Sequence, residues 1–490
     1  MSNDGAVSGF FRHSAIYALG SAMNRLGAFL LLPLYTRYLS LSEYGTLELF
    51  YAISAVVSGF LSVGIAHATL RFYFEYEAVE DRNAVVSTNF LASLAIGLSG
   101  ALILGVFAQP LAQTLVDGRP SQLALFLVLA TLVLELSSQV GLAYLRAREM
   151  SVMFIGLSSA KLVVQCVANA ILLLRFDSGV EGVLAGNLLA VALGWGMLSV
   201  LVWRQCGLRF ERAKLFPVLR YGLPFLYVTV IASVSGNFDR FLVNHLLSIE
   251  ALGVYALATK FSKLISDLLG EPFNRAYGAF RFSIMKRDDA AMIQADVLRY
   301  VATGLAVVSL ALIYFTADVI RWVATPTYAS AAGLMPLLVV AASLQMLNYL
   351  LQTGILINKS TKQLVAITLA RSGMSLALGY PLIYAFGLQG ACGLALCDAV
   401  LATVMTHRIS QRYFPVQYDL PRLTVLAGLL GGFFAVGLLV TFPGWAGLAM
   451  KASLLLLFIT SAIYTQLAPA ERRAGIVALA AVGRRRHAPL

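Results

Sequence analysis

Long apolar segments recur through the whole chain, and they restrict what it can fold into more than any other feature. Each is about 20 residues long, the length that an α-helix needs to cross the hydrocarbon core of a bilayer. Charged residues make up only 12% of the 490 residues, against about 25% in a globular domain, and the mean hydropathy is +0.80. The sequence therefore predicts an all-α polytopic membrane protein with about 14 transmembrane helices.

The predicted spans are separated by short polar connections. They cover residues 13–36, 46–69, 85–108, 121–143, 152–174, 181–203, 220–243, 251–279, 297–317, 331–356, 363–386, 389–407, 423–441 and 447–466. None of the connections is long enough to fold as a domain of its own. The first apolar run is too long for the core of a signal peptide, so we interpret it as a span.

The basic residues are unevenly divided between the two sides of the predicted membrane. With the N-terminus inside, 24 of the 36 lysines and arginines fall in cytoplasmic segments, five on the opposite side and seven within spans. This bias follows the positive-inside rule and predicts that both termini are cytoplasmic. It also explains the net charge of +12 without a nucleic-acid partner. The basic tail at 467–490 is expected to lie against anionic lipid.

An internal repeat with an offset of 208 residues is visible in four small residues. The matches are Ser40 with Ser248, Gly45 with Gly253, Gly179 with Gly387, and Gly182 with Gly390. Both sets fall in equivalent loops of spans 1–6 and 7–12. Because each copy contains an even number of spans, both have the same orientation and are expected to be related by an axis along the membrane normal.

The repeat predicts the organisation of the chain as two six-helix lobes followed by two extra helices. The N-lobe takes residues 1–207 with spans 1–6, and the C-lobe takes residues 208–416 with spans 7–12. Spans 13 and 14 occupy residues 417–466, and a cytoplasmic tail follows.

Five basic residues are predicted near the middle of the bilayer: Arg25, Lys161, Lys260, Lys263 and Arg371. Each would cost about 2.5–3.5 kcal/mol if it faced lipid, so all five together would cost on the order of 12–18 kcal/mol. We therefore expect them to line a hydrated cavity between the lobes. The positive potential of such a cavity would attract an anionic substrate.

Three carboxylates are candidates for ion or proton coupling: Asp398 at similar depth, and Glu135 and Asp267 one or two turns toward the cytoplasm. Lys161 and Arg371 have no acidic neighbour on their own helices, which favours a functional role. For Lys263 and Asp267, four residues apart, an intrahelical ion pair is an equally good interpretation.

The span at 251–279 carries a charged stripe on an otherwise apolar helix. On a regular α-helix, its five ionisable side chains would share a face roughly 120° wide. They are Lys260, Lys263, Asp267, Glu271 and Arg275. In a membrane, such a face must meet water or another protein surface, and Pro272 is expected to kink the helix.

Enzyme signatures are absent from the sequence. We find no zinc-protease, phosphate-loop, nucleophile-elbow or dinucleotide-binding motif in a usable context. The five histidines do not cluster, and the four cysteines have no metal-binding spacing. We therefore predict a transporter with no catalytic residues, no metal and no cofactor, whose energy comes from an ion gradient or from the gradient of its substrate.

Four segments carry a resemblance to a known family. They are LLPLYTRYLSLSEYGTLELF (31–50), AYLRAREMS (143–151), LRYGLPFLYVTVIASVSGNFDRFLV (219–243) and EALGVYALATKF (250–261). These resemble the polysaccharide-transporter branch of the multidrug/oligosaccharidyl-lipid/polysaccharide (MOP) flippase superfamily. The resemblance implies Wzx-type flippases, which turn undecaprenyl-diphosphate-linked oligosaccharides from the cytoplasmic to the periplasmic leaflet for O-antigen or exopolysaccharide synthesis.

The buried charges agree with that implication, because arginine and lysine are the natural partners of a diphosphate. We thus predict alternating access in the bacterial inner membrane, with Arg25, Lys161, Lys260, Lys263 and Arg371 binding the substrate. Contacts with a polysaccharide polymerase and a chain-length regulator are also expected. Two alternatives stay open: an ion-coupled multidrug exporter of the same superfamily, and a membrane polysaccharide polymerase or glycosyltransferase.

Overall fold

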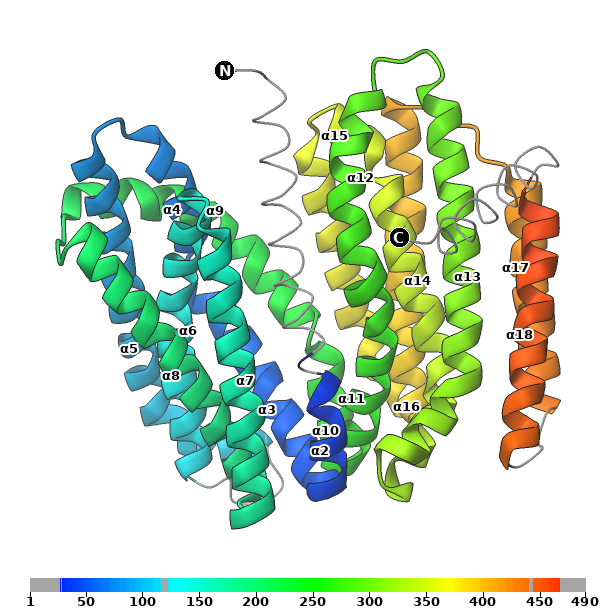
Figure 1. Ribbon diagram of the computed structural model, residues 1–490, viewed down its shortest axis with the longest axis horizontal. Helices are drawn as coiled ribbons and strands as arrows, with labels where there is room; N and C mark the ends of the chain where they lie inside the picture. The colour runs from blue at the N-terminus through cyan, green and yellow to red at the C-terminus, as the bar shows by residue number, and fades with distance from the viewer. Residues whose placement is uncertain (1–26, 28, 116–121, 440–443, 468–490) are drawn as a thin grey trace, which may run out of the picture. The chain divides into compact units, whose positions relative to one another are not determined.

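The fold is all-helical in the part of the chain that the structure describes (Figure 1). The computed structural model describes residues 27, 29–115, 122–439 and 444–467. Eleven of the described helical segments are long and apolar enough to cross a membrane. The prediction of an all-α polytopic membrane protein is confirmed.

The described helices group into two compact units. Unit 1 comprises residues 1–257, 323–330 and 372–394, and unit 2 comprises the remainder. Unit 1 contains α2 (Leu32–Tyr38), α3 (Leu41–Leu61), α4 (Ile65–Glu75), α5 (Val79–Leu115), α6 (Gln122–Ala147), α7 (Ser151–Phe176), α8 (Gly179–Cys206), α9 (Arg212–Ser235), α10 (Phe238–Leu246) and the first part of α11 (Ile249–Leu264).

Unit 2 begins within α11. It contains the π-helix η1 (Ile265–Gly270), α12 (Glu271–Ile284), α13 (Ala290–Val323), α14 (Met335–Leu351), α15 (Thr353–Ile357), α17 (Leu420–Leu439) and α18 (Gly444–Gln466). The 3-10 helix η2 (Pro326–Leu334) and the long helix α16 (Thr361–Tyr413) each contribute residues to both units.

Predicted spans 2–14 coincide with helices, while most of the first span lies outside the described residues. Spans 11 and 12 meet inside α16, where Gly387 has φ 57° and ψ −135° and breaks the helix into two. A side chain disfavours this backbone conformation, so a glycine is needed at that turn. Gly64, with φ 65°, follows a similar break between α3 and α4 inside span 2.

The prediction of one regular α-helix over span 8 is wrong. The six-residue π-helix η1 separates α11 from α12, and Pro272 lies in the first turn of α12. Proline lacks an N–H and its ring crowds the carbonyl four residues earlier, so a local widening of the helix relieves the clash. Because a π-helix has more residues per turn, the charged side chains on either side of it do not follow the regular 100° spacing.

The internal repeat is visible in matched local structure within unit 1. Gly45 lies against the backbone of α11, where an added Cβ would be 1.9 Å from the Ile249 carbonyl oxygen. Gly253 lies reciprocally against α3, where an added Cβ would be 2.6 Å from the Leu41 carbonyl oxygen. Leu41 and Ile249 are themselves 208 positions apart. This reciprocal contact is what a local two-fold axis between two copies produces.

The repeated serines and turn glycines also adopt matching conformations. Ser40 and Ser248 each accept a hydrogen bond at the side-chain oxygen from the backbone N–H three residues later, which caps a helix N-terminus. Gly179 and Gly387 both have positive φ, at 51° and 57°. The two copies of the repeat therefore share caps and turns as well as residue types.

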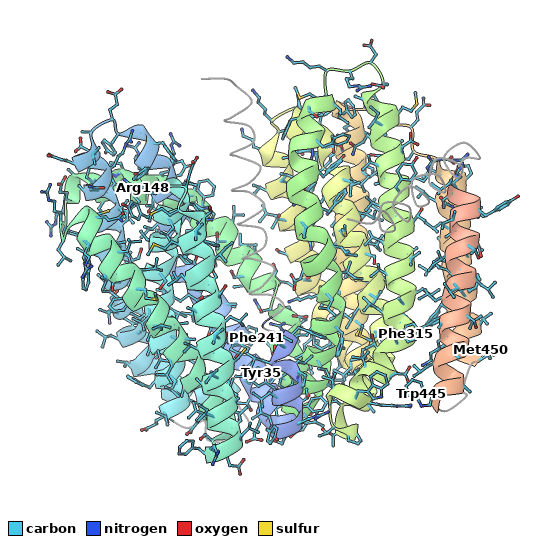
Figure 2. All side chains as sticks on the ribbon, viewed as in Figure 1. Tyr35, Arg148, Phe241, Phe315, Trp445 and Met450 are labelled. Atoms are coloured by element: carbon cyan, nitrogen blue, oxygen red, sulfur yellow. The ribbon has the colours of Figure 1, made fainter. Side chains whose placement is uncertain are left out.

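Unit 1 is held together by close helix packing and by a buried polar network. Helix α8 packs against both α6 and α7. The Asn169 amide donates to the Tyr35 hydroxyl oxygen at 2.6 Å and to Asn187 Oδ1 at 3.4 Å, and Asn187 donates to the Tyr51 hydroxyl oxygen at 2.7 Å (Figure 2 labels Tyr35). Gly186 leaves room for the Asn169 side chain, because an added Cβ there would overlap it. The network thus joins α2, α3, α7 and α8.

In unit 2, the hairpin of α17 and α18 packs on α13 through an apolar core that includes Leu310, Leu426 and Phe458. Lys451 Nζ of α18 lies 2.6 Å from Asp318 Oδ2 of α13, and both side chains are mostly buried. The Tyr314 hydroxyl of α13 donates to the Phe433 carbonyl of α17. These polar contacts fix the hairpin in register on α13.

Candidate functional site

A polar pocket of about 200 Å³ lies within unit 1, between α6, α7 and α8. Its lining residues are Glu135, Ser138, Gln139, Leu142, Leu157, Ser158, Lys161, Val191, Gly194 and Leu198. On each helix they follow spacings of three or four residues, so each helix contributes one face. The helices α6 and α7 supply the polar groups, and α8 supplies only apolar residues and glycine.

The two charged residues of this pocket form an ion pair between neighbouring helices. Lys161 Nζ of α7 lies 3.7 Å from Glu135 Oε1 of α6, with side chains that are 37% and 49% exposed. The pair is therefore electrically neutral, yet it is accessible from the surface of unit 1. Two residues predicted for different roles, substrate binding and coupling, are brought together in one place.

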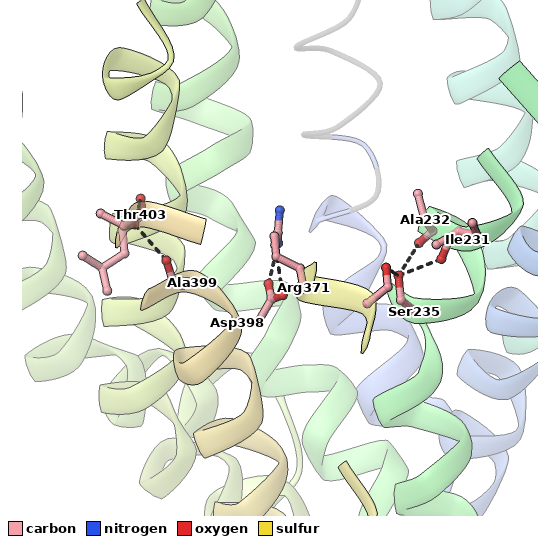
Figure 3. Close-up of polar contacts among 9 residues, drawn as sticks. Ile231, Ala232, Ser235, Arg371, Asp398, Ala399 and Thr403 are labelled. Carbon is pink, nitrogen blue, oxygen red and sulfur yellow. Dashed lines mark hydrogen bonds and ion pairs between the residues drawn. The ribbon is translucent and has the colours of Figure 1, made fainter. Parts of the chain in front are cut away.

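A second ion pair lies in unit 2, on the two halves of α16. The Arg371 guanidinium donates two hydrogen bonds to Asp398, with Nε 2.9 Å from Oδ1 and a second, shorter bond from Nη2 to Oδ2 (Figure 3). The side chains are 33% and 17% exposed. Two parallel bonds to one carboxylate make this the more rigid of the two pairs.

The remaining predicted site residues lie close to η1 or outside the described residues. Lys260 is half-buried near the end of α11, Lys263 is exposed, and Asp267 is half-buried within η1. All three take part in polar or electrostatic interactions. Arg25 is not among the residues that the structure describes.

The structure changes the charge balance expected from the sequence. Lys161 and Arg371 have no acidic neighbour on their own helical spans, but each has a carboxylate partner on an adjacent helix. Neither residue therefore supplies an uncompensated positive charge. Within the described residues, no group of three or more histidine, cysteine, aspartate or glutamate side chains could hold a metal ion.

Sequence reasoning missed the polar residues that accompany these pairs. Ser138 and Gln139 follow Glu135 at the spacing of one helical face, and Ser158 precedes Lys161 by three residues. This polar stripe in the segment LELSSQVG was the available signal. Gly194 gave no such signal, since only the packing shows that it faces the pocket.

Comparison with known proteins identifies the family. Residues 34–330 match the family model described as polysaccharide biosynthesis protein. The chain belongs to this family.

Two proteins of Haemophilus influenzae are similar to this polysaccharide biosynthesis protein. Lsg locus putative protein 1 is 23% identical over 286 residues, which cover 56% of this chain and 67% of that protein. An uncharacterized membrane protein is 24% identical over 313 residues, which cover 61% and 70%.

Solved structures show the fold of this family member. The lipid II flippase MurJ, in an inward closed conformation, is similar with a TM-score of 0.73 and 13% identity, over 91% of this chain and 98% of that one. An inward-facing multidrug resistance MATE family transporter of the MOP superfamily is similar with a TM-score of 0.64 and 16% identity, over 81% and 98%. The chain therefore has a MOP-type fold, as its sequence predicted.

Proposed function

We propose that this protein is a flippase that moves an undecaprenyl-diphosphate-linked oligosaccharide from the cytoplasmic to the periplasmic leaflet, for the synthesis of O-antigen or an exopolysaccharide. It works by alternating access of the two lobes at residues 1–207 and 208–416. The observation that carries this proposal is the combination of a polysaccharide biosynthesis family with the fold of a lipid II flippase. A lipid II flippase acts on a lipid-linked precursor, and a polysaccharide pathway supplies a chemically related one.

The positions of the basic residues support an anionic headgroup as the substrate. Lys260 and Lys263 lie in α11, next to a π-helix, a break often found at functional sites. We assign the binding of the diphosphate to these two lysines, to Arg371 and to Arg25. A guanidinium forms the same two parallel hydrogen bonds with a phosphate as with a carboxylate. A diphosphate can therefore replace Asp398 as the partner of Arg371.

The carboxylates support a coupling role in the same proposal. A coupling ion bound at Asp398 would compete with Arg371 for the carboxylate, and the guanidinium would become available to the diphosphate. Asp267 and Glu135 are further coupling candidates. A protein of this kind works in the bacterial inner membrane with cytoplasmic termini, where contacts with a polymerase and a chain-length regulator would receive its product.

The proposal is tested by deleting the gene and following the lipid-linked intermediates. We expect surface polysaccharide to be lost and a complete repeat unit to accumulate on its lipid carrier in the cytoplasmic leaflet. Wild-type protein restores the polymer, and Lys260→Met fails to restore it at equal abundance. Lys286→Met provides a control, because this lysine is exposed in the turn between α12 and α13. Normal polysaccharide in the deletion strain would refute the proposal.

The similarity to a multidrug transporter supports one competing function, an ion-coupled exporter. That function predicts increased sensitivity to toxic cations in the deletion strain, with surface polysaccharide unchanged. The same strain therefore decides between the two functions. We favour the flippase because the basic residues assigned to the site suit an anionic headgroup better than a cationic drug.

A further inference from the structure

The pocket of unit 1 is chemically different from a diphosphate site. Among the described residues that line it, Lys161 and Glu135 are the charged ones, and they compensate each other. A diphosphate would face the carboxylate as well as the ammonium group, and the repulsion would offset the attraction. The pocket is therefore suited to a neutral polar group.

The polar groups of the pocket can bind hydroxyl groups as both donors and acceptors. Lys161 offers N–H donors, Glu135 offers acceptor lone pairs, and the Gln139 amide offers both. The Ser138 hydroxyl donates to the Leu134 carbonyl at 2.7 Å, so its oxygen remains an acceptor toward the pocket. A sugar ring presents alternating donors and acceptors of this kind.

The opposite wall of the pocket is apolar and leaves open space. Val191, Gly194 and Leu198 of α8 form it, and no atom of the described residues lies within 4 Å of a Cβ built on Gly194. The apolar C–H face of a sugar can lie against such a wall while its hydroxyls face α6 and α7. The cavity of 200 Å³ is below the usual range of about 300–1,000 Å³ for drug-sized ligands, so it suits one sugar residue rather than a whole repeat unit.

We propose that this pocket is a sugar subsite, which binds one residue of the oligosaccharide while the diphosphate is held elsewhere. The inference rests on the proposed flippase function and assigns recognition of the glycan to α6, α7 and α8. Lys161 and Glu135 then select the sugar through hydrogen bonds, and they do not bind the diphosphate.

The test compares two lipid probes on purified protein in lipid nanodiscs. One probe is undecaprenyl diphosphate, and the other is the same lipid carrying one hexose or one N-acetylhexosamine. We expect the best sugar-bearing probe to bind wild-type protein about tenfold more tightly than undecaprenyl diphosphate does, which corresponds to about 1.4 kcal/mol. The ratio of these two affinities is the sugar-dependent ratio. Gly194→Leu fills the pocket and should reduce this ratio to about one, while the affinity for undecaprenyl diphosphate is kept. Gly196→Leu is the matched control, because this site also has open space but does not line the pocket.

A second variant tests the charge argument without changing the volume. Glu135→Gln leaves Lys161 uncompensated, so the sugar-dependent ratio should fall while undecaprenyl diphosphate binds more tightly at low salt. In the double variant Glu135→Gln/Lys161→Met, the tighter binding of undecaprenyl diphosphate should be lost, because the uncompensated positive charge is removed.

Two results would overturn the subsite. One is a sugar-dependent ratio that is unchanged in Gly194→Leu, and the other is an equal loss of affinity for both probes. If wild-type protein binds neither probe, the flippase proposal itself fails, and the subsite fails with it.

Discussion

The Arg371–Asp398 pair allows a quantitative prediction for the described structure. For two charges about 4 Å apart, an effective dielectric constant near 20 gives a gross attraction of about 4 kcal/mol, which we take for this pair. Desolvation offsets part of it, and both side chains are only partly exposed, at 33% and 17%. We therefore expect a net interaction free energy of about 2 kcal/mol between the two side chains, which lies between the values for exposed and fully buried ion pairs.

A double-mutant cycle measures this coupling. Arg371→Ala and Asp398→Ala should each lower the unfolding free energy in detergent by about 2–3 kcal/mol, because each leaves an unpaired partner. The loss of unfolding free energy in the double variant should be about 2 kcal/mol smaller than the sum of the losses in the two single variants. Single effects that add within about 0.5 kcal/mol would refute the reasoning. Arg371→Lys should recover only part of the coupling, because lysine cannot form the two parallel bonds.

The remaining predictions concern packing and turns, and thermal unfolding checks each of them. Gly45→Ala should destabilise the protein by about 1–3 kcal/mol or more, because its Cβ would be 1.9 Å from a carbonyl oxygen. Gly156→Ala, where the added Cβ meets no described atom within 4 Å, should change stability by less than about 0.5 kcal/mol. Lys451→Met leaves Asp318 unpaired and should cost about 1–3 kcal/mol and raise protease cleavage of the C-terminal hairpin. Gly387→Ala forces a side chain into φ 57° and should cost about 1–3 kcal/mol.

The fold class and the candidate site differ in how far the sequence could predict them. Helical spans follow from the length of apolar runs, because each backbone polar group in lipid must be satisfied within its own helix. The ionisable residues in those spans are equally visible, because few occur there. The partner of Lys161 was not visible, since Glu135 lies 26 positions away on another helix. Side-chain pairing between helices depends on their rotation and packing, which hydropathy does not encode.

Span 8 also combines a feature that the sequence predicted with one that only the structure showed. Its apolar length predicted a membrane crossing, but the charged stripe assumed a regular turn, and the π-helix before Pro272 removed that regularity. Four small residues matched at an offset of 208 showed a repeat in the sequence, and the structure showed that one matched pair, Gly45 and Gly253, lie against each other's helices. The sequence by itself determined that the chain is an all-helical membrane protein with small residues repeated at an offset of 208, because both features depend on local composition or periodicity. Only the tertiary structure decided which charges are compensated and where a polar pocket opens, because both depend on distances between residues far apart in the chain.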